Sequence, residues 1–232
     1  MNRTRNEEYN ILAPPFYAPN KAIVYCHGHE QTHDQDIQYG PMTDKFTALA
    51  NAGYTVLIPQ MKNTWGNQEA VDQLDRAMEL LDIPKQVGLF SYGVGSLTAL
   101  NWSRQNLAKT FAVALALPVL DVERKYELKE YHNEILEAYP NPFRQRTDLT
   151  QYREDWFPMT YSPGQLRNLK IRIWASENDW FGEIYDTART WNGAGARKST
   201  ISLGNAGHDC APIDPQEVVQ FFDDCGGRVS GL

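Results

Sequence analysis

The stretch VGLFSYGVGS at residues 87–96 decides the fold prediction, because a short apolar run ends there in a glycine-rich turn. Residues 87–90 show no alternation of polar and apolar side chains, which is typical of a strand covered on both faces of a sheet. Gly93, Gly95 and Ser96 follow, and glycine permits the strained backbone by which a strand turns sharply into a helix. The stretch therefore predicts strand, turn and helix in direct succession.

Similar apolar runs recur along the chain and alternate with helical patterns. Apolar stripes at residues 42–50 and 70–81 predict two helices, the first ending at Gly53, and Asp214 with Pro215 predicts the start of a last helix. Strands alternating with helices predict an α/β fold with a mostly parallel sheet and helices on both faces. The predicted strands are residues 21–26, 54–59, 86–90, 110–118, 170–175 and 199–203.

One long segment interrupts this alternation. Between residues 121 and about 165 no strand is predicted, and Leu128, Tyr131, Ile135 and Tyr139 form a helical stripe before an aromatic loop broken by prolines. A long aromatic insertion between two strands of a compact sheet favours a helical cap. The alternative role of each aromatic ring is only to pack the insertion onto the body. We therefore predict one domain over residues 1–232, with a cap insertion at about 121–165.

Composition narrows the class of protein. The chain has 232 residues, 42% of them hydrophobic, and a formal net charge of −7, and no run of Lys and Arg exceeds two residues. Nucleic acid is therefore not an expected partner, since binding to its phosphates needs clustered positive charge.

The sequence also favours a cytoplasmic protein without a membrane span, metal or cofactor. The longest uncharged apolar stretch, 110–120, is too short to cross a bilayer, and the first eight residues contain no apolar segment. Cys26, Cys210 and Cys225 cannot pair completely, which suits a reducing compartment. The five histidines lack the paired spacing of metal ligands.

Polar, glycine-rich segments follow four of the predicted strands. They are residues 27–29, 91–96, 176–180 and 204–209. In an open α/β sheet the ligand site lies beyond the carboxyl ends of the strands, so these segments should meet. Their chain order is a loop with backbone donors, a sharp turn, an acid at Asp179 and a histidine at His208, which predicts nucleophilic acyl chemistry.

These segments resemble the α/β-hydrolase superfamily over nearly the whole chain. Within it, the pattern is most similar to the acyl-ACP thioesterases (acyl transferases) of bacterial luminescence, in residues 87–90, in the insertion after residues 118–121 and in residues 178–180. The resemblance implies an α/β-hydrolase fold and a serine-type esterase, thioesterase or acyl transferase. Its expected substrate is a small-molecule ester or thioester with a hydrophobic acyl group.

Two registers of the turn compete for the nucleophile position. The family pattern places small residues two before and two after the nucleophile. With Ser91 as nucleophile, Leu89 precedes it at that spacing; with residue 93 there, Ser91 precedes and Gly95 follows, and residues 87–90 remain an unbroken strand. The second register fits better, and it makes Gly93 the nucleophile position.

Because glycine cannot attack a carbonyl, three interpretations remain open. The chain is an engineered Ser→Gly form of an active hydrolase, a natural non-catalytic relative that binds a small apolar ligand, or an enzyme in which Ser91 reaches His208. Without a nucleophile, the remaining groups could still leave a ~10³–10⁴-fold acceleration over water. His208 and Asp179 acting alone in proton abstraction, and a thiol nucleophile at Cys26 or Cys210, are weaker alternatives.

The other site residues follow from the same resemblance. His208 would be the general base and then the general acid, and Asp179 would orient it, with Glu177 as the alternative acid. The backbone N–H groups of His29 and Val94 would form the oxyanion hole. The substrate-binding candidates are His27, Gly28, Tyr92 and Trp180, and His27 and Gly28 have the alternative role of shaping their loop.

Overall fold

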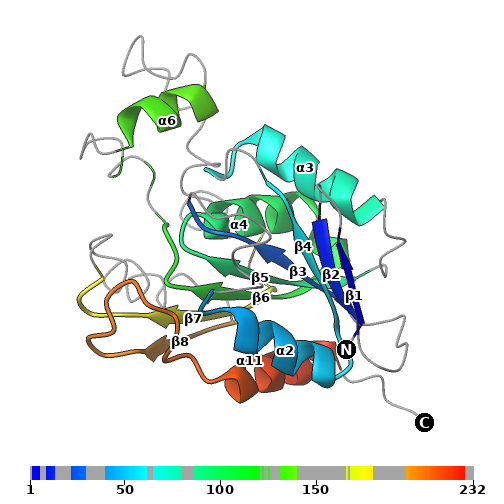
Figure 1. Ribbon diagram of the computed structural model, residues 1–232. Coiled ribbons are helices and arrows are strands. Elements are labelled where there is room, and N and C mark those ends of the chain that lie inside the picture. The colour runs from blue at the N-terminus through cyan, green and yellow to red at the C-terminus, as the bar shows by residue number, and fades with distance from the viewer. Residues whose placement is uncertain are drawn as a thin grey trace.

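Figure 1 shows the computed structural model, which describes residues 2–5, 9–13, 22–29, 40–61, 65–79, 86–120, 122, 125, 131–139, 166, 168–179 and 197–227. Within these ranges eight strands form one sheet in the order β1-β2-β4-β3-β5-β6-β7-β8. The strands from β4 to β8 in that order pair parallel, and β1 and β2 pair antiparallel at one edge. The strands are β1 (Asn2–Arg5), β2 (Tyr9–Ala13), β3 (Ala22–Cys26), β4 (Thr55–Pro59), β5 (Val87–Tyr92), β6 (Thr110–Ala116), β7 (Lys170–Ala175) and β8 (Arg197–Ser202).

Helices cover both faces of the sheet. Figure 1 shows α3 and α4 on one face and α2 and α11 on the other. Each face has its own apolar core, and successive residues of a strand serve opposite cores: Leu89 packs with the α4 residue Leu97, and Phe90 with the α11 residue Phe222. The helices are α2 (Thr43–Asn51), α3 (Gln68–Glu79), α4 (Gly95–Gln105), α6 (His132–Ala138) and α11 (Pro215–Phe222), with short turns η1 (Leu107–Lys109) and η3 (Asp223–Gly227).

The predicted α/β class with a mostly parallel sheet is confirmed, with corrections at its edges. β1 and β2 were not predicted: Asn2–Arg5 is polar throughout, and the short Tyr9–Ala13 contains the polar Asn10. β5 continues two residues past its predicted end, through Tyr92. β6 ends two residues earlier than predicted, and β8 begins two residues earlier.

The helix α6 belongs to the long insertion between β6 and β7. Its Ile135 is buried, as the helical stripe predicted. The amide of Asn67 donates to the carbonyl of Ala138 at 2.7 Å, and the Tyr139 hydroxyl donates to the carbonyl of Trp65 at 2.7 Å, so the end of α6 is tied to the segment before α3. The aromatic loop expected at 140–165 lies outside the described residues.

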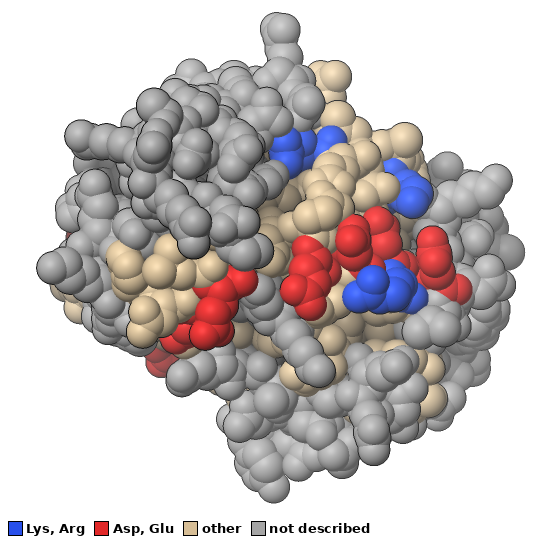
Figure 2. All heavy atoms as spheres, turned by 90° about the horizontal axis from the view of Figure 1, so that it is seen from above, with Lys and Arg blue, Asp and Glu red and all other residues tan. Residues whose placement is uncertain are grey.

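Carboxylates gather on the face of the molecule that carries α3 (Figure 2). Glu69, Asp72 and Glu79 are exposed there, with Arg76 beside them. A local excess of negative charge repels polyanions.

Among the helices in the described ranges, none combines the length and the apolar character needed to span a bilayer.

Candidate active site

A sharp turn joins β5 to α4 at Gly93. The φ of Gly93 is +52°, in the left-handed region that glycine enters without steric cost. Its N–H donates to the carbonyl of Ala116 at 3.1 Å, and its carbonyl accepts from the N–H groups of Ser96 and Val119 at 3.2 and 2.9 Å. Backbone bonds to the end of β6 and to α4 thus hold the turn, independently of any side chain at position 93.

A second glycine brings the loop after β3 against this turn. A Cβ added at Gly95 would lie 2.2 Å from the carbonyl oxygen of Cys26 and 2.4 Å from that of His27. Both contacts are to backbone, which has little room to move. Only glycine therefore fits at position 95, and its absent side chain allows residues 26–28 to pass directly over the first turn of α4.

An acid and a histidine meet beside the turn. Nδ1 of His208, after β8, lies 2.9 and 2.8 Å from the two carboxylate oxygens of Asp179, after β7. The Asp179 side chain is 1% exposed and that of His208 9%. Because an ionised carboxylate only accepts hydrogen bonds, we infer that in the neutral imidazole Nδ1 carries the proton and Nε2 carries none.

The Nε2 nitrogen of His208 faces Gly93. A Cβ built on Gly93 would lie 3.3 Å from Nε2 and 3.7 Å from Cε1 of His208, and the next nearest atom among the described residues, Cα of Gly28, is 4.0 Å away. A hydroxyl group on a side chain at position 93 would therefore be within hydrogen-bond reach of the imidazole.

Ser91 has a different environment. Its side chain is fully buried, and its hydroxyl lies 2.9 Å from the hydroxyl of Ser96 and 3.5 Å from the carbonyl oxygen of Ala114. It lies within β5, two residues before the turn. This geometry favours the register that puts residue 93, not Ser91, opposite His208.

The side chains of Tyr92 and Asn178 hold the loop that carries His208. The Tyr92 hydroxyl donates to the backbone carbonyl of His208 at 2.8 Å, and the two rings lie 4.9 Å apart. The side-chain oxygen of Asn178 accepts from the N–H of Gly207 at 2.7 Å. Tyr92 was expected to bind substrate, and its hydroxyl donates instead to the loop that carries His208. The sequence analysis did not identify Asn178 as a functional residue, although its position directly before Asp179 could have pointed to it.

Glu177 does not contact His208 in this arrangement. It is exposed, its backbone N–H donates to the carbonyl of Gly204 at 2.8 Å, and its carboxylate accepts from the hydroxyl of Ser202 at 3.3 Å. The structure therefore pairs His208 with Asp179 rather than with the alternative acid.

His27 braces the loop after β3. The backbone N–H of Met61 donates to Nε2 of His27 at 3.1 Å, so Nδ1 carries the proton and donates to the carbonyl of Gly28 at 3.0 Å. The His27 side chain has both ring nitrogens engaged, and the residue is 1% exposed. This geometry favours loop shaping over substrate contact for His27. Gly28 is buried beside Gly93.

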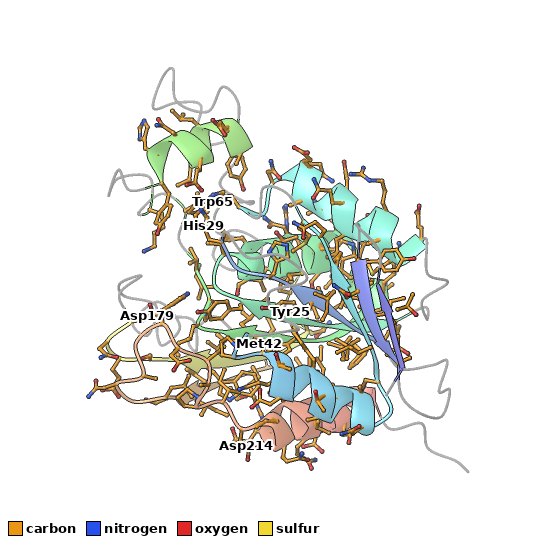
Figure 3. All side chains as sticks on the ribbon, in the orientation of Figure 1. Tyr25, His29, Met42, Trp65, Asp179 and Asp214 are labelled. Atoms are coloured by element: carbon orange, nitrogen blue, oxygen red, sulfur yellow. The ribbon has the colours of Figure 1, made fainter. Side chains whose placement is uncertain are left out.

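His29 connects that loop to α6. Its Nε2 is paired with the carboxylate of Glu134 on α6, and its ring lies 5.0 Å from the ring of Tyr131 and 6.0 Å from that of Trp65. Figure 3 shows His29 and Trp65 just below α6, and Asp179 at the same edge of the sheet. Trp180 lies outside the described residues.

Val94 lies at the other end of the expected oxyanion hole. It is the N-cap residue of α4, where backbone N–H groups have no helical partner, and it is 1% exposed. Among the described residues, no backbone acceptor for its N–H is found. A buried free donor at a helix N-terminus suits a developing negative charge.

The cysteines contribute no nucleophile at the turn. Burial strongly raises the pKa of the Cys26 thiol, which keeps it protonated and unreactive. Cys210 is buried with its sulfur 3.3 Å from that of Met42. Within the described ranges, no cluster of three or more His, Cys, Asp or Glu residues is arranged to hold a metal ion.

The chain is similar in structure to several hydrolases. The fluorophosphonate-binding serine hydrolase FphF of Staphylococcus aureus matches with a TM-score of 0.70 and 11% identity, covering 97% of each chain. An esterase B of Lactobacillus rhamnosis matches at 0.71 and 13%, covering 94% of this chain and 81% of that one. An S-formylglutathione hydrolase of Agrobacterium tumefaciens matches at 0.66 and 12%, covering 96% and 91%.

Sequence comparison adds no closer relative, since no protein-family model and no curated protein sequence matches the chain. At these identities the structural likeness establishes the architecture alone. It extends over nearly the full length of the chain. The protein therefore has the α/β-hydrolase fold.

Proposed function

We propose that this protein is built for acyl hydrolysis of an ester or thioester, with residue 93 at the nucleophile position. One observation carries the proposal: Nε2 of His208, whose Nδ1 is bound to Asp179, lies 3.3 Å from the Cβ position of residue 93. In this arrangement His208 is the general base and then the general acid, and Asp179 orients it and stabilises the imidazolium.

The oxyanion hole is assigned to the N–H groups of Val94 and His29. Among the described residues the N–H of Val94 has no backbone acceptor, which supports this assignment, as does the close packing of residues 26–28 on α4 at Gly95. A donor of this kind contributes about 3–4 kcal/mol to stabilisation of the transition state.

The substrate is a small molecule with a hydrophobic acyl group. The rings of His29, Trp65 and Tyr131 form an aromatic cluster next to the loop at residues 27–29, and Tyr131 is the N-cap residue of α6. We assign the insertion at about 121–165 the role of a cap over the site, and Trp180 that of a further contact to the acyl group. The structural neighbours, an esterase and an S-formylglutathione hydrolase among them, support an ester or thioester as substrate.

A thioesterase or acyl transferase like that of bacterial luminescence is the finer form of this proposal. It rests on the motifs at residues 87–90 and 178–180. A cytoplasmic location belongs to the same proposal. The absence of disulfides among Cys26, Cys210 and Cys225 in the described chain fits a reducing compartment.

The test is to restore a hydroxyl at position 93. Gly93→Ser is compared with the parent chain and with Gly93→Ala, which carries the same Cβ without the hydroxyl, on p-nitrophenyl esters and acyl thioesters. We expect kcat/KM for Gly93→Ser to exceed that of Gly93→Ala by at least ~10³-fold, with a burst of one product per chain. Equal rates for the two variants would refute the proposal.

The second candidate is a non-catalytic protein that keeps the fold and binds a small apolar ligand. The glycine at position 93 is the observation that favours it. It predicts that fatty acids or acyl amides raise Tm while Gly93→Ser remains inert. The same panel of variants thus separates the two candidates.

A further inference from the structure

We propose that Glu134 on α6 is a positioning residue for the proposed acyl hydrolysis. Its carboxylate holds the side chain of His29, and through it the loop at residues 27–29, so that the backbone N–H of His29 keeps the place assigned to it in the oxyanion hole. This inference rests on the proposed function. It gives the insertion between β6 and β7 a part in the reaction, in addition to covering the substrate.

The contact joins two segments that lie 105 positions apart in the chain. The carboxylate of Glu134 accepts a hydrogen bond from Nε2 of His29. The His29 side chain is 17% exposed and that of Glu134 is 46% exposed. A hydrogen bond to an ionised carboxylate is strong and directional, so the orientation of the His29 ring follows the position of Glu134.

The helix α6 provides a fixed support for this carboxylate. Ile135 and Ala138 are buried in the core on the α4 side of the sheet. The amide of Asn67 donates to the carbonyl of Ala138, and the hydroxyl of Tyr139 donates to the carbonyl of Trp65, both at 2.7 Å. Glu134 therefore projects from a helix that packing and two buried hydrogen bonds hold against the body of the protein.

The same side of α6 also contacts the His29 ring through an aromatic side chain. Tyr131 lies three residues before Glu134, a spacing that places both residues on one side of a helix. The ring of His29 lies edge-on to the ring of Tyr131 at 5.0 Å and to that of Trp65 at 6.0 Å. Figure 3 shows His29 and Trp65 close together below α6. Ring packing and the ion pair thus fix the His29 side chain from the same direction.

The loop lies close to the catalytic turn, so its position matters for the reaction. The ring of His27 fixes the first part of the loop through two hydrogen bonds, one of them to the carbonyl of Gly28. Cα of Gly28 is 4.0 Å from the Cβ position of residue 93, and His29 follows directly. A displacement of about 1 Å in a catalytic group can cost about 10²-fold in rate. We therefore assign the anchoring of the third loop residue to Glu134.

The experiment compares three variants in the Gly93→Ser background on a p-nitrophenyl ester. Glu134→Ala should lower kcat about 10-fold with KM unchanged, less than the roughly 10²–10³-fold lost when an oxyanion donor is removed. Glu134→Gln keeps an acceptor for Nε2 and should return kcat to within about 3-fold of the background. Glu137→Ala is the control, because it removes an exposed carboxylate from the same helix and leaves the His29 pair intact. Its kcat should equal that of the background.

Two further measurements distinguish positioning of the oxyanion donor from general support of the fold. A trifluoromethyl ketone forms a hemiketal oxyanion on the serine, and its inhibition constant should rise in Glu134→Ala by the factor that kcat/KM falls. When His29→Ala is already present, adding Glu134→Ala should change kcat by less than about 2-fold, because the carboxylate acts only through that ring. Since the pair is partly exposed, Tm should stay within about 4 °C.

An unchanged kcat in Glu134→Ala would overturn the inference, and so would a rise in KM alone or an equal loss in the presence of His29→Ala. Failure of the proposed function has another signature, an inert Gly93→Ser. In that case hydrogen exchange in the parent chain decides: Glu134→Ala should speed exchange in the peptide that carries residues 27–29 by about 10-fold relative to Glu137→Ala. Equal exchange in the two variants would show that Glu134 does not hold the loop.

Discussion

The hydroxyl of Tyr92 donates to the backbone carbonyl of His208 at 2.8 Å, so the last residue of β5 holds the loop that follows β8. Tyr92 directly precedes Gly93, and His208 faces Gly93 from the other side. The turn and His208 are therefore fixed to one another by this hydrogen bond as well as by the sheet.

Removing that hydroxyl should impair catalysis rather than binding. In the Gly93→Ser background, we expect Tyr92→Phe to lower kcat by about 5–10-fold with KM nearly unchanged, and to lower the free energy of unfolding by about 1 kcal/mol. Steady-state kinetics on a p-nitrophenyl ester measure kcat and KM separately. A rise in KM with constant kcat would instead return Tyr92 to the substrate-binding role expected from the sequence.

Asn178 should act through the same loop. Its side-chain oxygen accepts from Gly207 N–H at 2.7 Å, next to His208, and Asn178 itself directly precedes Asp179. In the Gly93→Ser background, Asn178→Ala should lower kcat about 10-fold, and Asn178→Asp, which keeps the acceptor, should restore most of it. If Asn178→Asp is as impaired as Asn178→Ala, the accepted hydrogen bond is not what positions His208.

Gly95 should tolerate no side chain. Because a Cβ there would lie 2.2 and 2.4 Å from two backbone carbonyl oxygens, Gly95→Ala should destabilise the protein by about 3 kcal/mol or more. Gly204→Ala is the control: φ is +60° but no described atom lies within 4 Å, so only backbone strain of about 1–2 kcal/mol applies. Urea denaturation compares the two, and equal losses would contradict the close approach.

Ser91 should be dispensable for turnover. In the Gly93→Ser background, Ser91→Ala should change kcat/KM by less than about 2-fold, while the lost hydrogen bond to Ser96 costs about 1 kcal/mol of stability. Activity assays and thermal unfolding check this. Loss of activity in the parent chain on Ser91→Ala alone would support Ser91 as the nucleophile.

Thiol reactivity should follow burial. Burial raises the pKa of Cys26 and of Cys225, and Cys225 is the less buried of the two. A disulfide reagent at pH 8 should therefore label Cys225 slowly and leave Cys26 unlabelled until the chain is unfolded. Mass spectrometry of labelled peptides measures this, and rapid labelling of Cys26 would revive the thiol alternative.

Burial of the Cys26 thiol also makes the free energy of unfolding depend on pH. The folded state holds the Cys26 thiol protonated, so this contribution to stability is complete below the unfolded thiol pKa of about 8.5 and declines as pH rises above it. We expect the unfolding midpoint in urea to fall between pH 8 and 10, and Cys26→Ala to reduce that slope.

The sequence predicted the central sheet well because its strands carry their own signal. Residues 22–26 and 87–90 are apolar on both faces, and the structure buries every one of them. The antiparallel edge was missed because Asn2–Arg5 gains its pairing from β2 rather than from its own side chains. The pattern of apolar residues along a segment indicates which of its residues are buried. β1 has no such pattern, and it forms a strand because it pairs with β2.

The site was predictable in its order along the chain but not in its contacts. Small residues at 91 and 95 indicated the register of the turn, and the polar ends of β7 and β8 indicated Asp179 and His208. No pattern in the sequence links Tyr92 to the carbonyl of His208, which lies 116 positions further along the chain, or Glu134 to His29. Such contacts depend on how distant loops pack, which periodicity does not encode.

Main-chain hydrogen bonds hold the turn at Gly93 and do not need a side chain there, but any residue other than glycine is strained at φ +52°. Glycine and serine codons can differ by one nucleotide. Under the proposed function, a single point mutation at this codon therefore adds or removes the nucleophile, while Asp179, His208 and the backbone donors stay unchanged.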